Sequence, residues 1–291
     1  MCPVSKKYYS IAGVRFSVET PFEYAEREPY SLFTADAGVT DVRYVFHECD
    51  ALPAPEGRLL FEDPNYRAYL VGDGIRRYIG FYNNGRILDP PFALAEYSAS
   101  GGGDVTVYMP RDRKVPRSAA FIYRSLCVEH LITSHGGLIL HSSYIKTSRG
   151  AILFTAPSET GKSTQAELWR VHRGAEVING DCSVIRRTDG GLSAHGLPFS
   201  GTSNICSNES NVLAAIVYLT QAPQNIIRKL SGIEAYKALM QGAKVNTWHR
   251  ADAAAAIDAI NGIIGEVPIF RLDCTPDERA VEALERALSE N

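Results

Sequence analysis

A glycine-lysine loop between an expected strand and an expected helix limits the fold of this chain most. Residues 150–156, "GAILFTA", are typical of a short buried strand, and "STQAELWRVHR" downstream is typical of a helix. The loop between them ends in Gly-Lys-Ser-Thr. A strand that opens through a tight loop into a helix N-terminus points several backbone N–H groups at one spot, where the helix dipole favours an anion. The segment therefore predicts a phosphate-binding loop.

The residues of this loop divide the expected roles between them. Lys162 is expected to reach the β- and γ-phosphates of a nucleotide, and Ser163 to offer its hydroxyl to a magnesium ion. The full nucleotide-contacting set is Ser158, Thr160, Gly161, Lys162, Ser163 and Thr164. Ala156 stands where the strict pattern has glycine, which costs about 1 kcal/mol if the backbone needs a positive φ there. The alternative is a chance tetrapeptide at the start of a surface helix.

Phosphoryl transfer also needs an acidic residue beside the metal, and "EVINGDCSVI" supplies Asp181. Its carboxylate follows an apolar run, so we expect it at the carboxyl end of a strand, where open α/β sheets bind ligands. The alternative is a turn aspartate between strands. His141, in "LILHSSYI", is a further candidate, although a lone histidine on a strand is more often a satisfied core residue.

The chain changes character near residue 112. Before it, "GVRFSVE" and "DVTVYMP" alternate apolar and polar residues, and Asn/Asp-Gly steps predict hairpins and a β-meander. After it, "SAAFIYRSLCVEHLITSHGG" predicts one helix capped by Ser118, and strands then alternate with helices up to the amphipathic "PDERAVEALERAL". We expect a β-rich domain over 1–112 and an α/β domain over 113–291.

Composition narrows the class of partner. The chain has 30 basic and 33 acidic residues, a net charge of -3 and no long run of either sign, so we expect neither nucleic acid nor an anionic membrane as a partner. Six scattered cysteines without a C-x-x-C pair fit neither a zinc site nor a disulfide framework. The N-terminus lacks the apolar stretch of a signal peptide, and a cytoplasmic protein is expected.

Six segments, taken in order, resemble the HPr kinase/phosphorylase and phosphoenolpyruvate carboxykinase superfamily, and its small HPr kinase-like members in particular. They cover about residues 118 to 288, and each is weak alone: "LILHSSYI", "GAILFTAPSETGKST", "GAEVINGDCSVI", "HGLPFSGTSN", "LAAIVYLTQAPQNIIRKLSGIEAYKAL" and "VPIFRLDCTPDERAVEAL". The resemblance implies a carboxykinase-like P-loop domain with a mixed sheet, preceded by a smaller β-rich domain. It also implies ATP and Mg²⁺.

The resemblance implies roles for particular residues. Lys162 is identified with the phosphate-binding lysine, and Ser163 and Asp181 with the metal ligands. Asp181 matches the second acid of the family's paired-aspartate motif, and His141 matches a histidine near the transferred phosphate. "PFSG" (residues 198–201) matches a loop close to the phosphates.

The sequence departs from the family at several positions. Gly180 replaces the first acid of the pair, so Asp181 acts alone or shares its task with another group, for which Glu209 is a candidate. The glutamate-arginine-glycine signature of true HPr kinases is not recognisable, which argues against HPr as the substrate.

Two functions follow as hypotheses. The first is an ATP-dependent kinase that transfers the γ-phosphate to a serine or other hydroxyl of a small protein, peptide or metabolite, with Asp181, His141 and Lys162 as catalytic residues. The second is a catalytically reduced nucleotide-binding sensor or assembly module, favoured by Gly180 and Ala156. Phosphate release at the same site, the choice between ATP and GTP, and homo-oligomer formation stay open.

Overall fold

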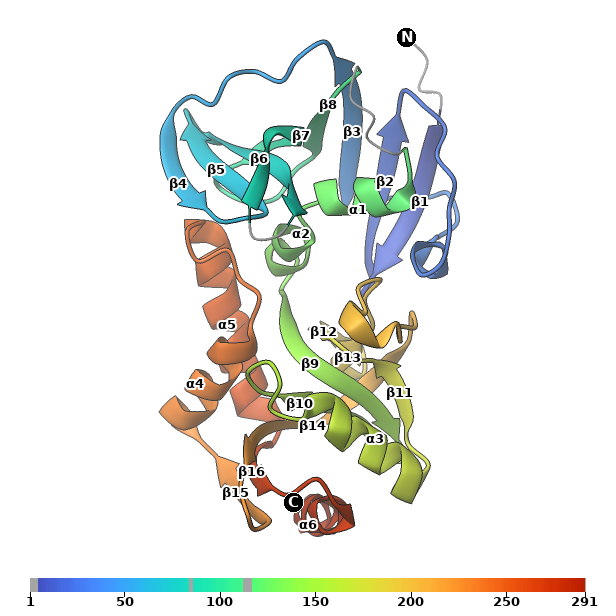
Figure 1. Ribbon diagram of the computed structural model, residues 1–291, viewed down its shortest axis with the longest axis vertical. Helices are drawn as coiled ribbons and strands as arrows, with labels where there is room; N and C mark the ends of the chain where they lie inside the picture. The colour runs from blue at the N-terminus through green and yellow to red at the C-terminus, as the bar shows by residue number, and fades with distance from the viewer. Residues whose placement is uncertain (1–4, 84–85, 112–116, 291) are drawn as a thin grey trace. The chain divides into compact units, whose positions relative to one another are not determined.

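The computed structural model describes residues 5–83, 86–111 and 117–290 (Figure 1). The chain divides into two compact units. Unit 1 consists of Met1–His135 and Asn246–Ala254, and unit 2 of Gly136–Val245 and Ala255–Asn291. Each unit carries a mixed β-sheet, so the chain is a mixed α/β protein.

Unit 1 contains one eight-stranded sheet, in the order β1-β2-β3-β8-β7-β6-β5-β4. Pairs β2–β3 and β3–β8 are parallel and the others antiparallel. Strands β4 to β8 follow one another as antiparallel neighbours, which confirms the predicted meander. The elements are β1 (Ser5–Ile11), β2 (Val14–Thr20), η1 (Tyr30–Phe33), β3 (Val42–Cys49), β4 (Arg58–Glu62), β5 (Tyr66–Val71), β6 (Gly74–Asn83), β7 (Arg86–Ser98), β8 (Val105–Pro110), α1 (Ala119–Ser125) and α2 (Val128–Ser134).

The segment after residue 117 differs from its prediction in two ways. The single expected helix is two, α1 and α2, because Cys127 between them has a φ of 50°. Both helices belong to unit 1, which extends past the boundary expected at residues 112–113. The Phe121 ring packs edge-on against Phe92 at 5.5 Å, and Tyr44 donates its hydroxyl to the Leu126 carbonyl at 2.8 Å. These contacts tie α1 and its C-terminal residue to the sheet, and sequence periodicity does not report them.

Unit 2 contains a second sheet, in the order β10-β9-β12-β13-β14-β16-β15, with β11 beside β9 and a further parallel pairing of β10 with β14. Helix α5 (Arg250–Glu266) begins in unit 1 and continues in unit 2. The other elements are β9 (Gly137–Thr147), β10 (Gly150–Thr155), α3 (Lys162–Arg173), β11 (Glu176–Asn179), β12 (Cys182–Thr188), β13 (Gly191–His195), η2 (Gly201–Ser203), β14 (Ser210–Gln221), β15 (Ile226–Leu230), α4 (Gly232–Gly242), β16 (Ile269–Cys274) and α6 (Glu278–Ser289).

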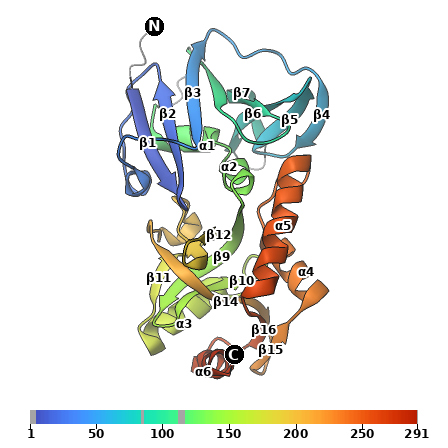
Figure 2. The same ribbon diagram turned by 180° about the vertical axis from the view of Figure 1, so that it is seen from behind.

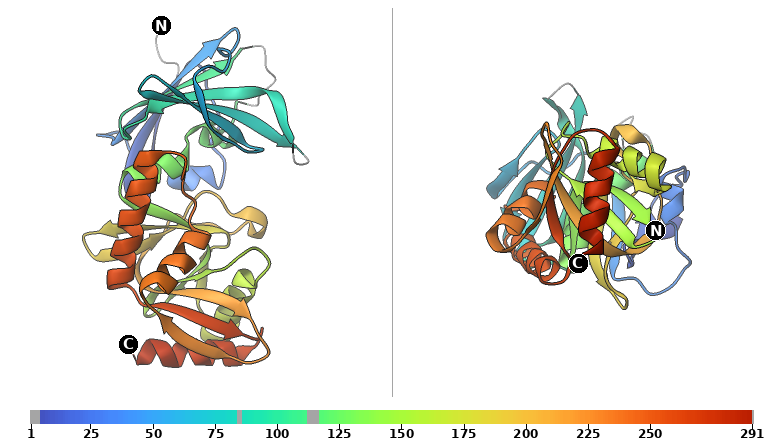
Figure 3. Two further views of the ribbon diagram at one scale, coloured as in Figure 1. Left: turned by 90° about the vertical axis from the view of Figure 1, so that its left-hand side faces the viewer. Right: turned by 90° about the horizontal axis from the view of Figure 1, so that it is seen from below.

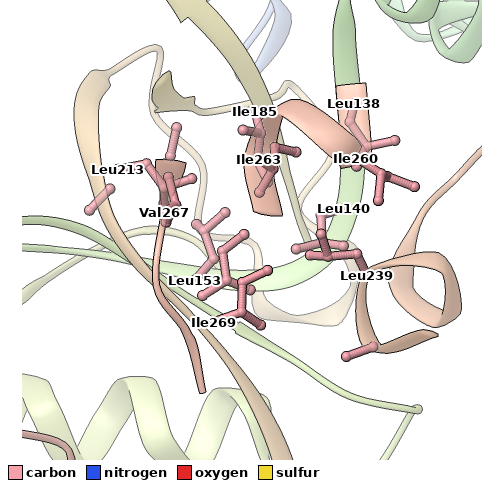
Figure 4. Packing of buried hydrophobic residues seen from close by; sticks show 14 of the residues in the cluster. Leu138, Leu140, Leu153, Ile185, Leu213, Leu239, Ile260, Ile263, Val267 and Ile269 are labelled. Carbon is pink, nitrogen blue, oxygen red and sulfur yellow. The ribbon is translucent and has the colours of Figure 1, made fainter. Parts of the chain in front are cut away.

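Strand β10 is buried on both faces, which explains its unbroken apolar run. Ile152 and Phe154 pack with residues of α3 and α6, whereas Leu153 packs with residues of α4 and α5. Figure 2 shows the same helix pairs from behind, and in Figure 3 the red α6 lies near the yellow-green α3. Figure 4 shows Leu140 of β9 beside Leu239 of α4, and Leu153 beside Ile269, in the cluster that contains Leu153. The strands expected at 150–156 and 267–274 are therefore present as β10 and β16, and the expected C-terminal helix as α6, which Asp277 caps by accepting from the Arg279 N–H.

None of the helices among the described residues is both long and apolar enough to cross a membrane.

Candidate functional site

The glycine-lysine loop lies between β10 and α3, so its expected strand-loop-helix setting is confirmed. Gly161 caps the helix with a φ of 112°, and a Cβ there would meet no atom within 4 Å, so backbone conformation and not space requires glycine. No side chain caps α3, and the first amide to bond back within it is that of Gln165, to the Gly161 carbonyl. The preceding amides of the first turn are left to point at a ligand.

Ala156 does not carry the strain that a missing glycine suggests. Among the described residues other than glycine, positive φ angles occur at Ala12, Cys127, Glu159 and Asn204, and Ala156 is not one of them. Its side chain is buried in the core cluster between β10 and α3. The left-handed turns of the loop fall at Glu159 and Gly161 instead, so the substitution leaves the loop intact.

Lys162 curls back over its own loop. Its Nζ donates to the carbonyls of Ala156 at 3.1 Å and Pro157 at 3.2 Å, and the residue is only 7% exposed. Burial lowers the pKa of Lys162, while the nearby charge of Asp181 opposes that shift. The ammonium is therefore held at the mouth of the loop and is electrostatically linked to the aspartate.

Asp181 is positioned by a buried asparagine that the sequence did not single out. Asn179 ends β11, and its Oδ1 accepts from the amides of Asp181 at 2.9 Å and Cys182 at 3.0 Å. Its Nδ2 donates to the carbonyls of Leu197 and Phe199. Through these hydrogen bonds Asn179 ties the turn that carries Asp181 to Leu197 and Phe199. The Asp181 side chain stays 29% exposed.

His141 lies on β9, opposite Cys182 of β12. Its Nδ1 is 2.9 Å from the Asp181 carbonyl oxygen and 3.5 Å from the Asp181 carboxylate. Because a carbonyl oxygen only accepts, Nδ1 carries the proton and Nε2 has a free lone pair in the neutral ring. Burial lowers the pKa of His141 and the Lys162 charge adds to this, against an opposing effect of Asp181. Neutral imidazole is therefore favoured at this position.

Two further groups complete the cluster. Lys244 places its Nζ 3.8 Å from the Asp181 carboxylate and 2.8 Å from the Cys182 sulfur. Cys182 donates its thiol to Asp181 at 2.9 Å, and burial raises the pKa of that thiol to about 12, so it stays protonated. The carboxylate consequently has a second cation beside it, which sequence spacing did not indicate because Lys244 lies 63 residues downstream of Asp181.

The segment from Pro198 to Ser203 packs directly on this turn. A Cβ at Gly201 would lie 2.9 Å from the Asp181 carboxyl carbon, and a Cβ at Gly180 would lie 2.2 Å from the Ser203 hydroxyl oxygen. Ser203 therefore fills the space into which a first acid at position 180 would project. The glycine is a condition for the close approach of this loop.

The other expected residues lie as follows. Thr160 is partly exposed, and Ser158, Ser163 and Thr164 are exposed, so their side chains are accessible along the loop and the first turn of α3. Glu209, the candidate to assist Asp181, instead forms an ion pair with Lys146 at 2.8 Å. Trp169 of α3 is buried in the core cluster beside β10.

Two hollows of about 470 and 480 Å³ lie on unit 2, and neither is lined by Lys162, Asp181 or His141. An anion at the loop would be held by backbone amides and charges, as helix N-termini hold phosphate.

Comparisons with known proteins add little to this geometry. No protein-family model matches the chain, and no curated protein matches it. Among solved structures, the HPr(Ser) kinase/phosphatase from Coxiella burnetii is similar at 12% identity. The match covers 52% of this chain and 96% of that one, with a TM-score of 0.30. A score this low does not establish a common fold.

Proposed function

We propose that this chain is an ATP-dependent kinase that transfers the γ-phosphate to a hydroxyl of a small protein, peptide or metabolite. The proposal includes a carboxykinase-like P-loop domain and an HPr kinase-like relationship. The observation that carries it is the electrostatic interaction of Lys162, at an uncapped helix N-terminus, with Asp181, in the turn between β11 and β12, and with His141 of β9.

The residues present fit a magnesium-nucleotide complex. The amides of the first turn of α3 suit phosphate oxygens, and the exposed hydroxyl of Ser163 and the carboxylate of Asp181 are hard oxygen ligands of the kind Mg²⁺ prefers. When bound, Mg²⁺ would neutralise charge on the phosphates. Lys162 would leave the carbonyls of Ala156 and Pro157 to bind the same oxygens, a short movement since those carbonyls belong to the loop itself.

Asp181 is the group best suited to the acceptor. Its carboxylate is partly exposed, is held by the turn that Asn179 fixes, and can orient an attacking hydroxyl or accept its proton. His141 assists in the neutral form: its Nδ1–H is held by the Asp181 carbonyl, so Nε2 can accept a hydrogen bond. Lys244 supplies a second positive charge beside Asp181, suited to negative charge that develops in transfer.

One observation favours the reduced alternative, a nucleotide-binding sensor or assembly module. Position 180 has no room for a first acid, because Ser203 occupies that space. A single carboxylate would then serve both the metal and the acceptor, and binding without turnover would be the outcome.

The test is nucleotide turnover by the purified full-length chain with Mg²⁺, with and without a pool of candidate hydroxyl acceptors. We expect wild type to turn over ATP, Lys162→Ala to lose nucleotide binding, and Asp181→Asn to keep binding but lose turnover. Lys237→Ala and Asp258→Asn, exposed substitutions of the same types in unit 2, are the matched controls and should behave as wild type.

Each result has a definite meaning. Binding without turnover in wild type, with acceptors present, would replace the kinase by the sensor. Absence of nucleotide binding in wild type would overturn both functions.

A further inference from the structure

A second group of ionisable side chains lies in unit 1 and takes no part in the proposed kinase chemistry. His130, on α2, and His249 and Asp252, at the start of α5, place three ligand atoms within 4.8 Å of one another. All three are buried, with exposures of 4%, 2% and 1%. Buried charged groups are retained in proteins when they are paired or bind a metal, so this cluster requires a physical explanation.

The hydrogen bonds of His249 define which of its nitrogens is free. Its Nε2 lies 3.0 Å from the Ala99 carbonyl oxygen, which can only accept, so Nε2 carries the proton. Its Nδ1 lies 2.9 Å from Asp252 Oδ1 but has no hydrogen-bond partner within the described part of the chain. A proton on Nδ1 would therefore not be shared with the carboxylate, whereas a cation beside both atoms would contact each.

The carboxylate is held ready for a cation in the same way. Asn246 donates its Nδ2 to Asp252 Oδ2 at 2.9 Å, and His130 Nδ1 lies 2.8 Å from Oδ1. Both carboxylate oxygens of Asp252 are therefore fixed in place, and Oδ1 lies within 2.9 Å of two imidazole nitrogens, His130 Nδ1 and His249 Nδ1.

The surroundings match the outer contacts of known metal sites. A ligating histidine usually donates its other N–H to a backbone carbonyl, and a ligating carboxylate is itself hydrogen-bonded, as Ala99 and Asn246 provide here. The Tyr97 ring stacks on His130 at 4.3 Å, and the Tyr97 hydroxyl is buried without a partner among the described residues.

We propose that His130 Nδ1, His249 Nδ1 and Asp252 Oδ1 form a binding site for a borderline transition-metal ion of the Zn²⁺ class. Two imidazoles and one carboxylate are ligands that suit this class. The ion displaces the proton that His130 shares with Asp252, and water takes its fourth position. Tetrahedral bonds of about 2.0–2.1 Å separate neighbouring ligands by roughly 3.3 Å, so binding moves the two nitrogens about 0.4–0.5 Å from the carboxylate oxygen. The bound ion fastens Asn246–Ala254 to α2 within unit 1.

The test is metal content. The full-length, untagged chain is stripped with a chelator, incubated with Zn²⁺, desalted and measured by mass spectrometry of the elements. We expect about one zinc per wild-type chain, and a loss of zinc in His249→Gln and Asp252→Asn. Asn246→Ala, which removes only the amide on Oδ2, should lower zinc affinity by about 10–100-fold.

Two controls separate this site from others. His195→Gln alters a buried histidine of unit 2 whose Nε2 also has no partner among the described residues, and it should retain zinc. Asp181→Asn, at the phosphate loop, should also retain it. Zinc lost from Asp181→Asn but kept by His249→Gln would place the ion at the phosphate site and overturn the proposal.

A wild-type measurement decides the question even if the variants do not fold. Co²⁺ added to the stripped chain should give the intense visible absorption of a tetrahedral site, and one equivalent of Zn²⁺ should remove it. If wild type retains neither ion, the cluster is a hydrogen-bond network without a metal, and the proposal is wrong.

Discussion

The two histidine-aspartate groups of this chain use the same side chains in opposite settings. At the phosphate loop, His141 and Asp181 are 26% and 29% exposed and 3.5 Å apart. In unit 1, His249 and Asp252 are 2% and 1% exposed and 2.9 Å apart. A histidine-carboxylate contact near solvent is worth little to stability but leaves its groups free to meet a ligand. A buried pair is costly to break, because removing one partner strands a charge. Exposure therefore distinguishes the pair at the phosphate loop, which is suited to catalysis, from the buried pair in unit 1, which is suited to holding segments of that unit together.

Asp181→Asn is the variant with the largest expected effect on the exposed pair. The amide keeps the size of the side chain but cannot accept a proton, so we expect turnover to fall by about 10²–10⁴-fold. The free energy of unfolding should change by less than about 1 kcal/mol, since the group is partly exposed. Turnover assays and urea denaturation of the same preparation measure both quantities. A variant with full turnover would remove Asp181 from the chemistry.

The reverse pattern is expected for Asp252→Ala. This change leaves His130 and His249 buried without their carboxylate, and we expect the free energy of unfolding to fall by about 3–5 kcal/mol. Urea denaturation of wild type and variant gives the difference. Asp258→Ala, an exposed residue of the same helix, is the control and should stay within about 0.5 kcal/mol of wild type. Equal losses in the two variants would contradict the assigned importance of the buried group.

His195 extends the comparison to a histidine whose pKa is shifted by burial, with no carboxylate involved. Burial lowers the pKa of His195 from 6.5 to about 4, and the Arg186 charge adds to the effect. The unfolded chain then binds more protons than the folded chain between these values, so stability is complete above pH 6.5 and falls as the pH drops toward 4. The loss from pH 7.5 to pH 5 should be about 2 kcal/mol. His195→Gln should flatten the dependence of the urea midpoint on pH by this amount, and an unchanged slope would show that His195 is not the titrating group.

A substitution at Gly180 tests whether the close packing of Ser203 requires glycine at this position. Gly180→Ala introduces a Cβ that meets Ser203, so we expect a loss of about 1–2 kcal/mol in unfolding free energy and lower turnover as the loop moves from Asp181. Ser203→Gly removes both clashing atoms, and the double variant should recover stability. No recovery in the double variant would mean that Ser203 is not the obstacle.

Local patterns in the sequence predicted much of the fold, but they predicted little of how the site residues come together. The strand, the loop and the helix at residues 150–173 follow from apolar runs and from glycine-lysine spacing, which act over neighbouring residues. The break at Cys127 was not predictable, because its left-handed backbone is imposed by the packing of α1 and α2 on the sheet. A helical pattern reports which residues are apolar and not whether the chain stays continuous between them.

The groups that sequence reasoning missed act across long separations. Asn179 was passed over because its role depends on the carbonyls of Leu197 and Phe199, which only the folded chain brings near. Lys244 lies close to Asp181 although it is 63 residues further along the chain, and Ser203 packs against Gly180 although it is 23 residues further along. The sequence suggested backbone strain at Ala156, but the folded loop takes its positive φ angles at Glu159 and Gly161. Only the folded loop shows which of its residues adopt that conformation.

The most direct test of the central claim is calorimetric titration of the full-length chain with ATP and Mg²⁺, comparing wild type with Lys162→Ala and Lys237→Ala. Wild type and Lys237→Ala should bind nucleotide with equal affinity, and Lys162→Ala should bind at least tenfold more weakly, a loss of about 1.4 kcal/mol or more. Equal affinity in all three proteins, or no binding by wild type, would contradict a nucleotide site at this loop.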